Sequence, residues 1–198
     1  MRLVFGLGNP GREYYKTRHN VGFLVIDCLS EKYQVDVENY CFRSLIGGGK
    51  IKGKKVILAK PLTFVNESGF SLKEIKTHYQ LSPEDIIVIS DDADLPLGRI
   101  RIAKKGGDGG HRGLRSIIQS LKTENFPRLR IGIGRPLEEM SLRDYVLEEF
   151  TPPEWELMEL IIQKATLAIE TVLTQGLDEA IQKYNRSFQA KLTTEDTE

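Results

Sequence analysis

The sequence has few of the features that mark secreted or membrane proteins. Its 198 residues include only two cysteines, Cys28 and Cys41, which suits a reducing compartment better than a disulfide scaffold. It contains no run of about 18 apolar residues, and Arg2 is followed by a short apolar stretch and a turn instead of a signal-peptide pattern. We therefore expect a cytoplasmic protein with no membrane partner.

A net charge is also missing, because 28 basic residues balance 28 acidic ones. The balance is uneven along the chain. Residues 96–135 hold ten Lys or Arg against two acidic residues, a net charge of +8, whereas residues 136–198 hold five against fourteen, a net charge of −9. This asymmetry suggests a face that binds a polyanion, with chance clustering on a solvated surface as the alternative.

Length and composition predict one domain, since 198 residues with 40% apolar content can bury a full core. Strand and helix patterns follow one another in mixed order. This predicts an α/β fold, a single domain whose central mixed, twisted β-sheet is flanked by helices on both faces. We expect the domain to span residues 1–191 and residues 192–198 to form an acidic, disordered tail.

Hydrophobic periodicity places the individual elements. It predicts a helix over residues 21–33 and a strand buried on both faces over residues 86–89. Strands at 42–46 and 55–59 flank several glycines, which predicts a hairpin with a flexible tip. Asn66 or Ser68 could cap the helix that follows. The other predicted elements are strands over 2–7, 99–103 and 128–134 and helices around 72–79 and 114–121 and over 140–149, 153–174 and 178–190.

The chain is organised around a bare turn, residues 6–11, and the polar cluster at residues 18–20. The glycine spacing of the turn matches the dinucleotide-binding fingerprint. However, Pro10 and a polar segment stand where the helix of that motif should begin, and the acidic residues near the required distance fall inside an apolar helix pattern. We therefore interpret the turn as a bare backbone surface that brings Asn9 and His19 together.

His19 and Asp91 form the predicted catalytic pair. A carboxylate at the end of a buried strand can accept the second ring N–H of an imidazole, which fixes its tautomer and raises its basicity. A nucleophile is missing, because the sequence has no Gly-x-Ser-x-Gly elbow and neither cysteine lies beside a bare loop. The imidazole would then activate water directly. A surface or helix-capping role is the alternative for His19.

Several neutral or glycine-rich loops are expected at the same edge of the sheet. The amides of Asn9 and Asn66 could hold a carbonyl or a water without adding charge. The second bare loop, residues 104–113, exposes backbone N–H groups at a helix start, where an anion can sit. The carboxylates of residues 91–94 could hold a divalent metal. No further carboxylates or histidine pair complete a coordination shell in the sequence, so we expect no metal.

Six segments, spread in order over residues 1–191, closely resemble the bacterial-type peptidyl-tRNA hydrolases. They are Gly-Leu-Gly-Asn-Pro-Gly (6–11), Thr-Arg-His-Asn-Val-Gly (17–22), Thr-Phe-Val-Asn-Glu-Ser-Gly (63–69), Asp-Asp-Ala-Asp-Leu-Pro (91–96), Gly-Gly-His-Arg-Gly-Leu (109–114) and Arg-Leu-Arg-Ile-Gly-Ile-Gly-Arg-Pro (128–136). The resemblance implies a monomeric esterase without cofactor or metal. Its substrate would be peptidyl-tRNA, cut between the peptide and the 3′ ribose, which recycles tRNA from prematurely released chains.

The resemblance also implies roles for single residues. His19 would be the base and Asp91 its orienting partner, while Asn9 and Asn66 would position substrate and water. Residues 140–152 resemble the family's mobile flap. The remaining implied contacts are Tyr14 and Phe64 on the peptide side and Arg101, Lys104, Lys105 and Arg130 on tRNA phosphates.

The chain departs from the family pattern at Arg112, where an asparagine that binds substrate and positions water is usual. A smaller departure is Val65, where methionine is common. We expect the longer, charged Arg112 to reach past the water site toward a phosphate or ribose at the tRNA 3′ end. Two other functions stay open, a non-catalytic RNA-binding module on the same fold and a metal-dependent phosphohydrolase.

Overall fold

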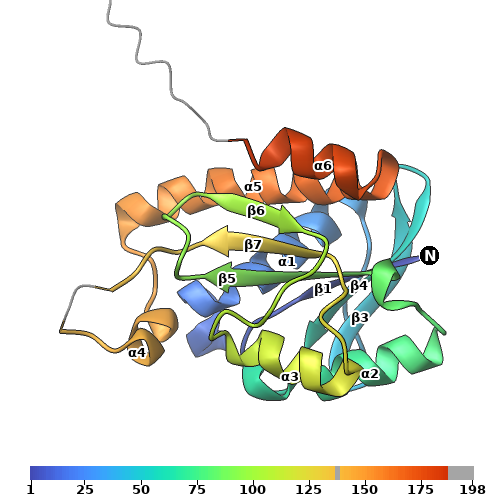
Figure 1. Cartoon of the computed structure of the whole chain (residues 1–198), viewed down its shortest axis with the longest axis horizontal. Coiled ribbons are helices and arrows are strands. Elements are labelled where there is room, and N and C mark those ends of the chain that lie inside the picture. Colours follow the sequence, from blue (N-terminus) through green and yellow to red (C-terminus); the bar gives the residue numbers. More distant parts are fainter. Residues whose placement is uncertain (137–138, 187–198) are drawn as a thin grey trace, which may run out of the picture.

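The computed structural model describes residues 1–136 and 139–186, and within them seven strands form one mixed sheet (Figure 1). The strand order is β2-β3-β4-β1-β5-β7-β6. The central strands β4, β1, β5 and β7 are parallel, and β2, β3 and β6 join antiparallel to their neighbours at the two sides. The bounds are β1 Arg2–Gly6, β2 Asn39–Cys41, β3 Ser44–Ile51, β4 Lys54–Pro61, β5 Ile86–Asp92, β6 Ile100–Ala103 and β7 Arg128–Gly132.

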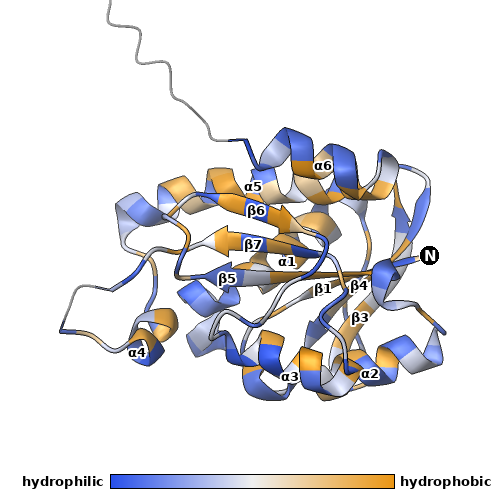
Figure 2. Ribbon diagram, viewed as in Figure 1, coloured by the Kyte–Doolittle hydropathy of each residue, from blue (hydrophilic) through white to orange (hydrophobic). Residues whose placement is uncertain are grey.

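Helices cover both faces of the sheet, as predicted (Figure 1). One core cluster packs α1, α5 and α6 on one face, and a second packs α2 and α3 on the other. Apolar residues gather on the strands between the two layers (Figure 2). The short helix α4 stands apart, beyond the end of the sheet. The helices are α1 Val21–Tyr33, α2 Ser68–His78, α3 Arg112–Leu121, α4 Leu142–Leu147, α5 Pro152–Thr174 and α6 Leu177–Tyr184.

The strongly periodic segments form where the sequence predicts them. The α1 bounds match the predicted helix, and α5 begins at a capping box in which Thr151 and Glu154 each bond the other's backbone. All seven residues of β5 are buried, in keeping with a central parallel strand covered on both faces. The predicted fold class, an α/β domain with a central mixed sheet between helices, is therefore confirmed.

The predicted flexible tip of the first hairpin is wrong. The glycines at positions 47–49 lie inside β3, and the turn falls at residues 52–53. A Cβ on Gly47 would lie 2.0 Å from the carbonyl oxygen of Asp36. Glycine is required there because the chain before β2 crosses the strand closely. That crossing is a tertiary contact, which a local composition rule cannot detect.

Two helix ends and one cap also differ from the prediction. The helix predicted over residues 140–149 is limited to α4. The last helix, predicted over residues 178–190, forms as α6 and ends at Tyr184, and residues 187–190 lie outside the described residues. The N-cap of α2 is Glu67, without a side-chain bond, so neither Asn66 nor Ser68 caps it. The predicted tail, residues 192–198, is likewise outside the described part of the chain.

Candidate active site

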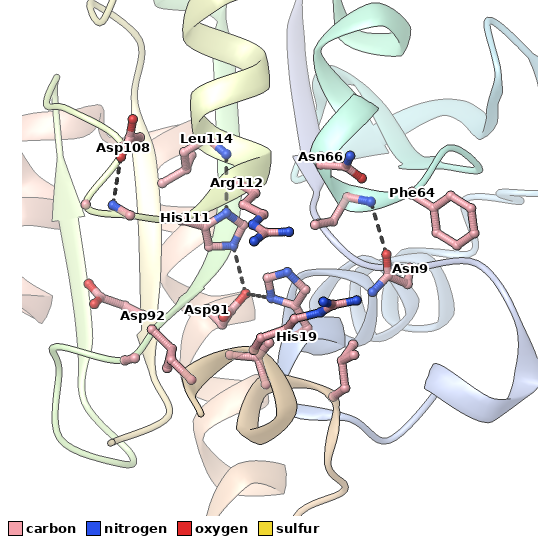
Figure 3. A pocket seen from close by; sticks show the side chains of 18 of the residues that line it. Asn9, His19, Phe64, Asn66, Asp91, Asp92, Asp108, His111, Arg112 and Leu114 are labelled. Carbon is pink, nitrogen blue, oxygen red and sulfur yellow. Dashed lines mark hydrogen bonds and ion pairs between the residues drawn. The ribbon is translucent and has the colours of Figure 1, made fainter. Parts of the chain in front are cut away.

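A cleft of about 540 Å³ opens where β1 and β5 end (Figure 3). Its walls come from the loops after β1, β4 and β5, the start of α3 and one side of α4. The lining residues include most of the predicted site, namely Asn9, Tyr14, His19, Phe64, Asn66, Asp91, Arg112 and Arg130, together with His111 and the α4 side chains Leu142, Arg143, Val146 and Leu147.

The bare turn after β1 is pressed against the start of α1. A Cβ on Gly22 would lie 2.4 Å from the carbonyl oxygen of Leu7, so only glycine allows this approach. The Asn20 amide then holds the turn: its oxygen accepts from the Asn9 N–H at 2.8 Å, and its nitrogen donates to the Asn9 carbonyl at 3.0 Å. The turn is rich in glycine because its backbone packs against the start of α1. Asn20, for which the sequence predicts no role of its own within the polar cluster, fixes the backbone of Asn9.

A carboxylate and two imidazoles meet at the floor of the cleft. Nδ1 of His19 lies 2.7 Å from Oδ1 of Asp91, and Nε2 of His111 lies 2.9 Å from the same oxygen (Figure 3). All three side chains are at least nine-tenths buried. The structure thus brings the predicted pair together and adds His111, whose role the sequence reasoning missed.

The position of His111 fixes its tautomer. It is the N-cap of α3, and its Nδ1 accepts from the backbone N–H groups of Gly113 at 3.1 Å and Leu114 at 3.3 Å. A nitrogen that faces two donors carries a lone pair, so the ring proton sits on Nε2 and is donated to Asp91. Two of the helix-start N–H groups expected to be open to an anion, those of Gly113 and Leu114, are therefore taken by His111.

The same hydrogen bonds decide whether the cluster could hold a metal. The ligand atoms of His19, Asp91 and His111 all lie within 4.8 Å of one another, so the expectation that no histidine pair joins the carboxylates is wrong. An imidazole that binds a metal through one nitrogen donates a proton from the other to an acceptor. The Nδ1 of His111 faces donors instead. The three residues therefore do not fit a resident metal ion.

The electrostatics of the pair favour a basic histidine. Burial lowers the pKa of His19, but the charge of Asp91 and its hydrogen bond raise it by more, so the pKa lies above the usual 6.5. Burial raises the pKa of Asp91, but the two imidazoles together lower it well below its usual 3.8. Asp91 therefore remains a carboxylate, and the Nε2 of His19 is left to act toward the cleft.

The two predicted amides differ in how they are held. Oδ1 of Asn9 accepts from the Val65 N–H at 3.0 Å, which turns its NH₂ group toward the cleft as a free donor (Figure 3). Asn66 is exposed in the single turn η3 (Val65–Glu67) on the facing wall. Phe64, which is 60% exposed, lies beside it. The cleft thus offers one rigid and one adaptable amide with an aromatic surface near both.

The four predicted phosphate ligands do not form one cluster. Arg130 lines the cleft, where its Nη2 forms a 2.5 Å ion pair with Asp92. Arg101 is exposed on β6, opposite Arg130 in the register. Lys104 and Lys105 follow the end of β6, which runs antiparallel to β7 and so ends at the sheet edge remote from Asp91. The loop then runs back to bring His111 to the cleft.

None of the described helices is long and apolar enough to cross a membrane. The fold and the site define a class of protein. A buried imidazole–carboxylate pair at the end of a mixed sheet, with amide donors and with no Ser, Thr or Cys among the described residues that line the cleft, is the arrangement of a hydrolase that activates water.

Comparison with known proteins gives the family. The chain belongs to the peptidyl-tRNA hydrolase family, whose model matches residues 3–193. It is 48% identical to the peptidyl-tRNA hydrolase of Thermoanaerobacter sp. (strain X514) over 93% of this chain and 100% of that one. The Bacillus subtilis (strain 168) enzyme is 45% identical over 93% and 98%. A crystal structure of the Acinetobacter baumannii enzyme, 39% identical, superposes with a TM-score of 0.88 over 93% and 94%. The predicted family is confirmed.

Proposed function

We propose that this cleft hydrolyses peptidyl-tRNA at the ester between the peptide and the 3′ ribose of tRNA, with His19 as the base. The observation that carries this assignment is the 2.7 Å contact between His19 and Asp91, which leaves Nε2 of a basic imidazole facing the cleft. Membership of the family makes the protein a carboxylic ester hydrolase. The role of each residue is our inference from the geometry.

The reaction needs one proton relay. His19 Nε2 takes a proton from water as the water oxygen bonds to the ester carbonyl carbon. The negative charge that develops on the carbonyl oxygen is stabilised by the amide NH₂ of Asn9, and Asn66 orients the substrate or the water. As the intermediate collapses, the bond to the ribose oxygen breaks and the imidazolium returns its proton to that oxygen. The products are free tRNA and a peptide carboxylate.

The carboxylate and the second imidazole act on His19 in opposite directions. Asp91 stabilises the imidazolium that forms during the reaction. The proton that His111 donates to the same oxygen makes Asp91 less basic, so the carboxylate does not take the proton itself. His111 is thus a positioning residue, because it acts through Asp91 and not on the substrate.

The walls of the cleft divide between the two parts of the substrate. Tyr14, Phe64 and the apolar side chains of α4 suit a peptide of varied sequence. Arg112 is exposed on the opposite wall and points into the cleft (Figure 3), which suits a phosphate or ribose near the 3′ end. Arg101, Lys104, Lys105 and Arg130 would bind phosphates farther along the tRNA.

Three further proposals rest on the sequence and the resemblance. These are a cytoplasmic location, a monomeric state, and a domain that spans residues 1–191 with a tail at residues 192–198. Sedimentation of the pure protein tests the monomer, since a second, heavier species at micromolar concentration would contradict it.

Cleavage of an N-blocked aminoacyl-tRNA tests the function and the base together. We expect wild-type protein to release free tRNA at an unchanged rate when a chelator is present, and His19→Ala to lower kcat by roughly 10² to 10⁴ with the fold intact. Absence of wild-type cleavage would favour the non-catalytic RNA-binding alternative. Loss of cleavage with chelator would favour the metal-dependent one, and wild-type turnover by His19→Ala would remove His19 as the base.

A further inference from the structure

Arg18, the residue before the base, is buried without contact to the cleft. Its side chain is 4% exposed and reaches the segment that links α4 to α5 and the first turn of α5. Its Nη1 donates to the Glu149 carbonyl at 2.6 Å, and its Nη2 forms a 2.7 Å ion pair with Glu154. A buried guanidinium costs free energy unless such partners surround it. The contacts are therefore specific to one arrangement of this segment.

Backbone and aromatic contacts reinforce the same junction. The Arg18 N–H donates to the Glu148 carbonyl at 3.0 Å, and Thr17 forms a β-bridge with Glu149. The guanidinium also lies over two rings, 4.3 Å from the centroid of Tyr145 and 5.2 Å from that of Phe150. Stacking and forked donation together are properties of arginine that lysine does not share.

The rings over Arg18 belong to the structure that walls the cleft. Tyr145 is the buried residue of α4, and its hydroxyl donates to the Ile133 carbonyl at 2.7 Å, just after β7. Leu142, Val146 and Leu147 of the same helix line the cleft. One side of α4 therefore faces the substrate while Tyr145 lies on Arg18, next in sequence to the base.

We infer that Arg18 is a positioning residue that holds the α4 wall at a fixed distance from His19 and so determines how the peptide part of the substrate is bound. This inference rests on the proposed function, since α4 walls that cleft. Without Arg18, α4 occupies its binding-competent position for a smaller fraction of the time. The apparent affinity falls by the same factor, while the imidazole and its carboxylate keep their geometry.

The chain supplies a matched control in Arg128. This arginine is 2% exposed, donates to the carbonyls of Gly107 and Glu124, and lies 4.2 Å over the ring of Phe126. Like Arg18, it is a buried guanidinium that donates to two backbone carbonyls and lies over an aromatic ring, but among the described residues it forms no ion pair and does not contact α4. Arg128→Lys therefore reproduces the loss of stability from a truncated buried guanidinium without loosening the α4 wall.

The test compares Arg18→Lys with Arg128→Lys in peptidyl-tRNA cleavage. For Arg18→Lys we expect KM to rise about tenfold, the effect of losing one charged hydrogen bond, while kcat stays within a few-fold and the acid limb of the pH profile is unmoved. Arg128→Lys should leave KM unchanged at a similar loss of thermal stability. Equal KM values for the two variants would overturn the inference, as would a fall in kcat alone.

A second readout does not depend on activity. Trp155, the only tryptophan, follows Glu154 and lies 6.3 Å from the ring of Phe150. Its fluorescence should shift in Arg18→Lys and not in Arg128→Lys, and an unshifted spectrum would contradict the inference even if wild-type protein failed to cleave the substrate. Should Arg18→Lys not fold, Glu154→Gln keeps an acceptor for the Thr151 cap but removes the ion pair. It should change KM and fluorescence in the same direction, to a smaller extent.

Discussion

At the scale of single residues, chemistry here depends on which atoms each polar group leaves free. Asp91 uses one oxygen to accept from two imidazoles, and Asn9 uses its oxygen on a backbone N–H. What remains toward the cleft is a lone pair on His19 and a donor on Asn9. The roles we propose for His19 and Asn9 therefore follow from the hydrogen bonds that occupy the other polar atom of each side chain.

The effect of Asp91 on the base can be measured from pH dependence. The pKa of His19 lies above 6.5 because of Asp91, so kcat/KM should rise with pH through a midpoint above that value. Asp91→Asn removes the charge while burial still lowers the pKa of His19. We expect a smaller loss of kcat than for His19→Ala and a shift of the acid limb to lower pH. A shift to higher pH would show that Asp91 does not stabilise the imidazolium.

The same pair links pH to stability. The folded-state pKa of His19 is raised above its unfolded value, so its contribution to the free energy of unfolding is complete below the unfolded pKa and is lost as pH rises through the folded one. As pH rises from below 6.5 to above the folded-state pKa, wild-type protein should therefore lose a part of its stability that His19→Ala does not lose.

Arg112 is tested by restoring the family's usual residue. Arg112→Asn shortens the side chain and removes its charge, so we expect KM to rise while kcat holds within a few-fold. Lys122→Asn, at the exposed C-terminal end of the same helix and not among the residues that line the cleft, is the control and should change neither constant. A large fall in kcat with unchanged KM would instead place Arg112 among the groups that act on the reacting atoms.

At the scale of elements, His111 couples the start of α3 to the carboxylate of Asp91. Its ring accepts two backbone N–H groups on one side and donates to Asp91 on the other. Asparagine is a good N-cap but is too short to span both. His111→Asn can therefore keep the N-cap of α3 while it removes the hydrogen bond to Asp91.

We expect His111→Asn to keep most of the helix stability, whereas His111→Ala should cost about 1 kcal/mol more in the free energy of unfolding. Both variants should lower kcat/KM by about tenfold, since both lose the bond to Asp91. Denaturant unfolding and steady-state rates give the two numbers. Wild-type kcat/KM in the asparagine variant would limit His111 to helix capping.

The basic strand β6 and the loop after it make an element-scale prediction about tRNA. Lys105 is exposed and follows the end of β6, whose last residue Ala103 lies roughly 13 Å along β7 from the level of Asp92, toward the end of the sheet remote from the cleft. Lys105→Ala should raise KM for full-length tRNA substrates and reduce the salt dependence by about one phosphate contact. It should leave a short peptidyl-nucleotide unaffected, and Lys55→Ala on the other side of the sheet should leave both unaffected. Equal losses on both substrates would indicate a folding defect.

At the scale of the whole molecule, residues 96–135 present less positive charge at the surface than the net charge of +8 counted in their sequence. Carboxylates neutralise many of their side chains, some of them from distant parts of the chain, and Arg128 is buried. The ion pairs are Lys104 with Asp178, Arg115 with Asp108, Arg130 with Asp92 and Arg135 with Asp94. The field that steers tRNA therefore comes from fewer cations than the count suggests.

A side chain pairs with one residue of the edge strand β6. Asn185, just after α6, accepts from the Ile102 N–H at 2.7 Å and donates to the Ile102 carbonyl at 2.8 Å, as a further strand would. Asn185→Ala should lower the free energy of unfolding by about 1–3 kcal/mol, since two buried backbone groups lose their partners. Asn125→Ala, at an exposed site, is the control for calorimetry. An unchanged Tm would mean that water satisfies the edge equally well.

The sequence by itself determined what depends on a few neighbouring residues. Apolar periodicity defines α1, continuous apolar runs define β5, and the capping box defines the start of α5. The residue motifs also identify the family, and with it His19, Asp91 and the two amides. These patterns depend only on residues near one another in the sequence, so they can be recognised without knowing how the segment packs in the fold.

Only the tertiary structure decided which distant groups meet. The Asp91 oxygen joins His19, 72 residues away in sequence, and also His111. Gly47 serves a close crossing and not a flexible turn. Lys105 lies far from the cleft because β6 runs antiparallel to β7, and Arg18 meets a segment about 130 residues later. Such contacts are selected by packing the whole core at once, and no local pattern carries that information.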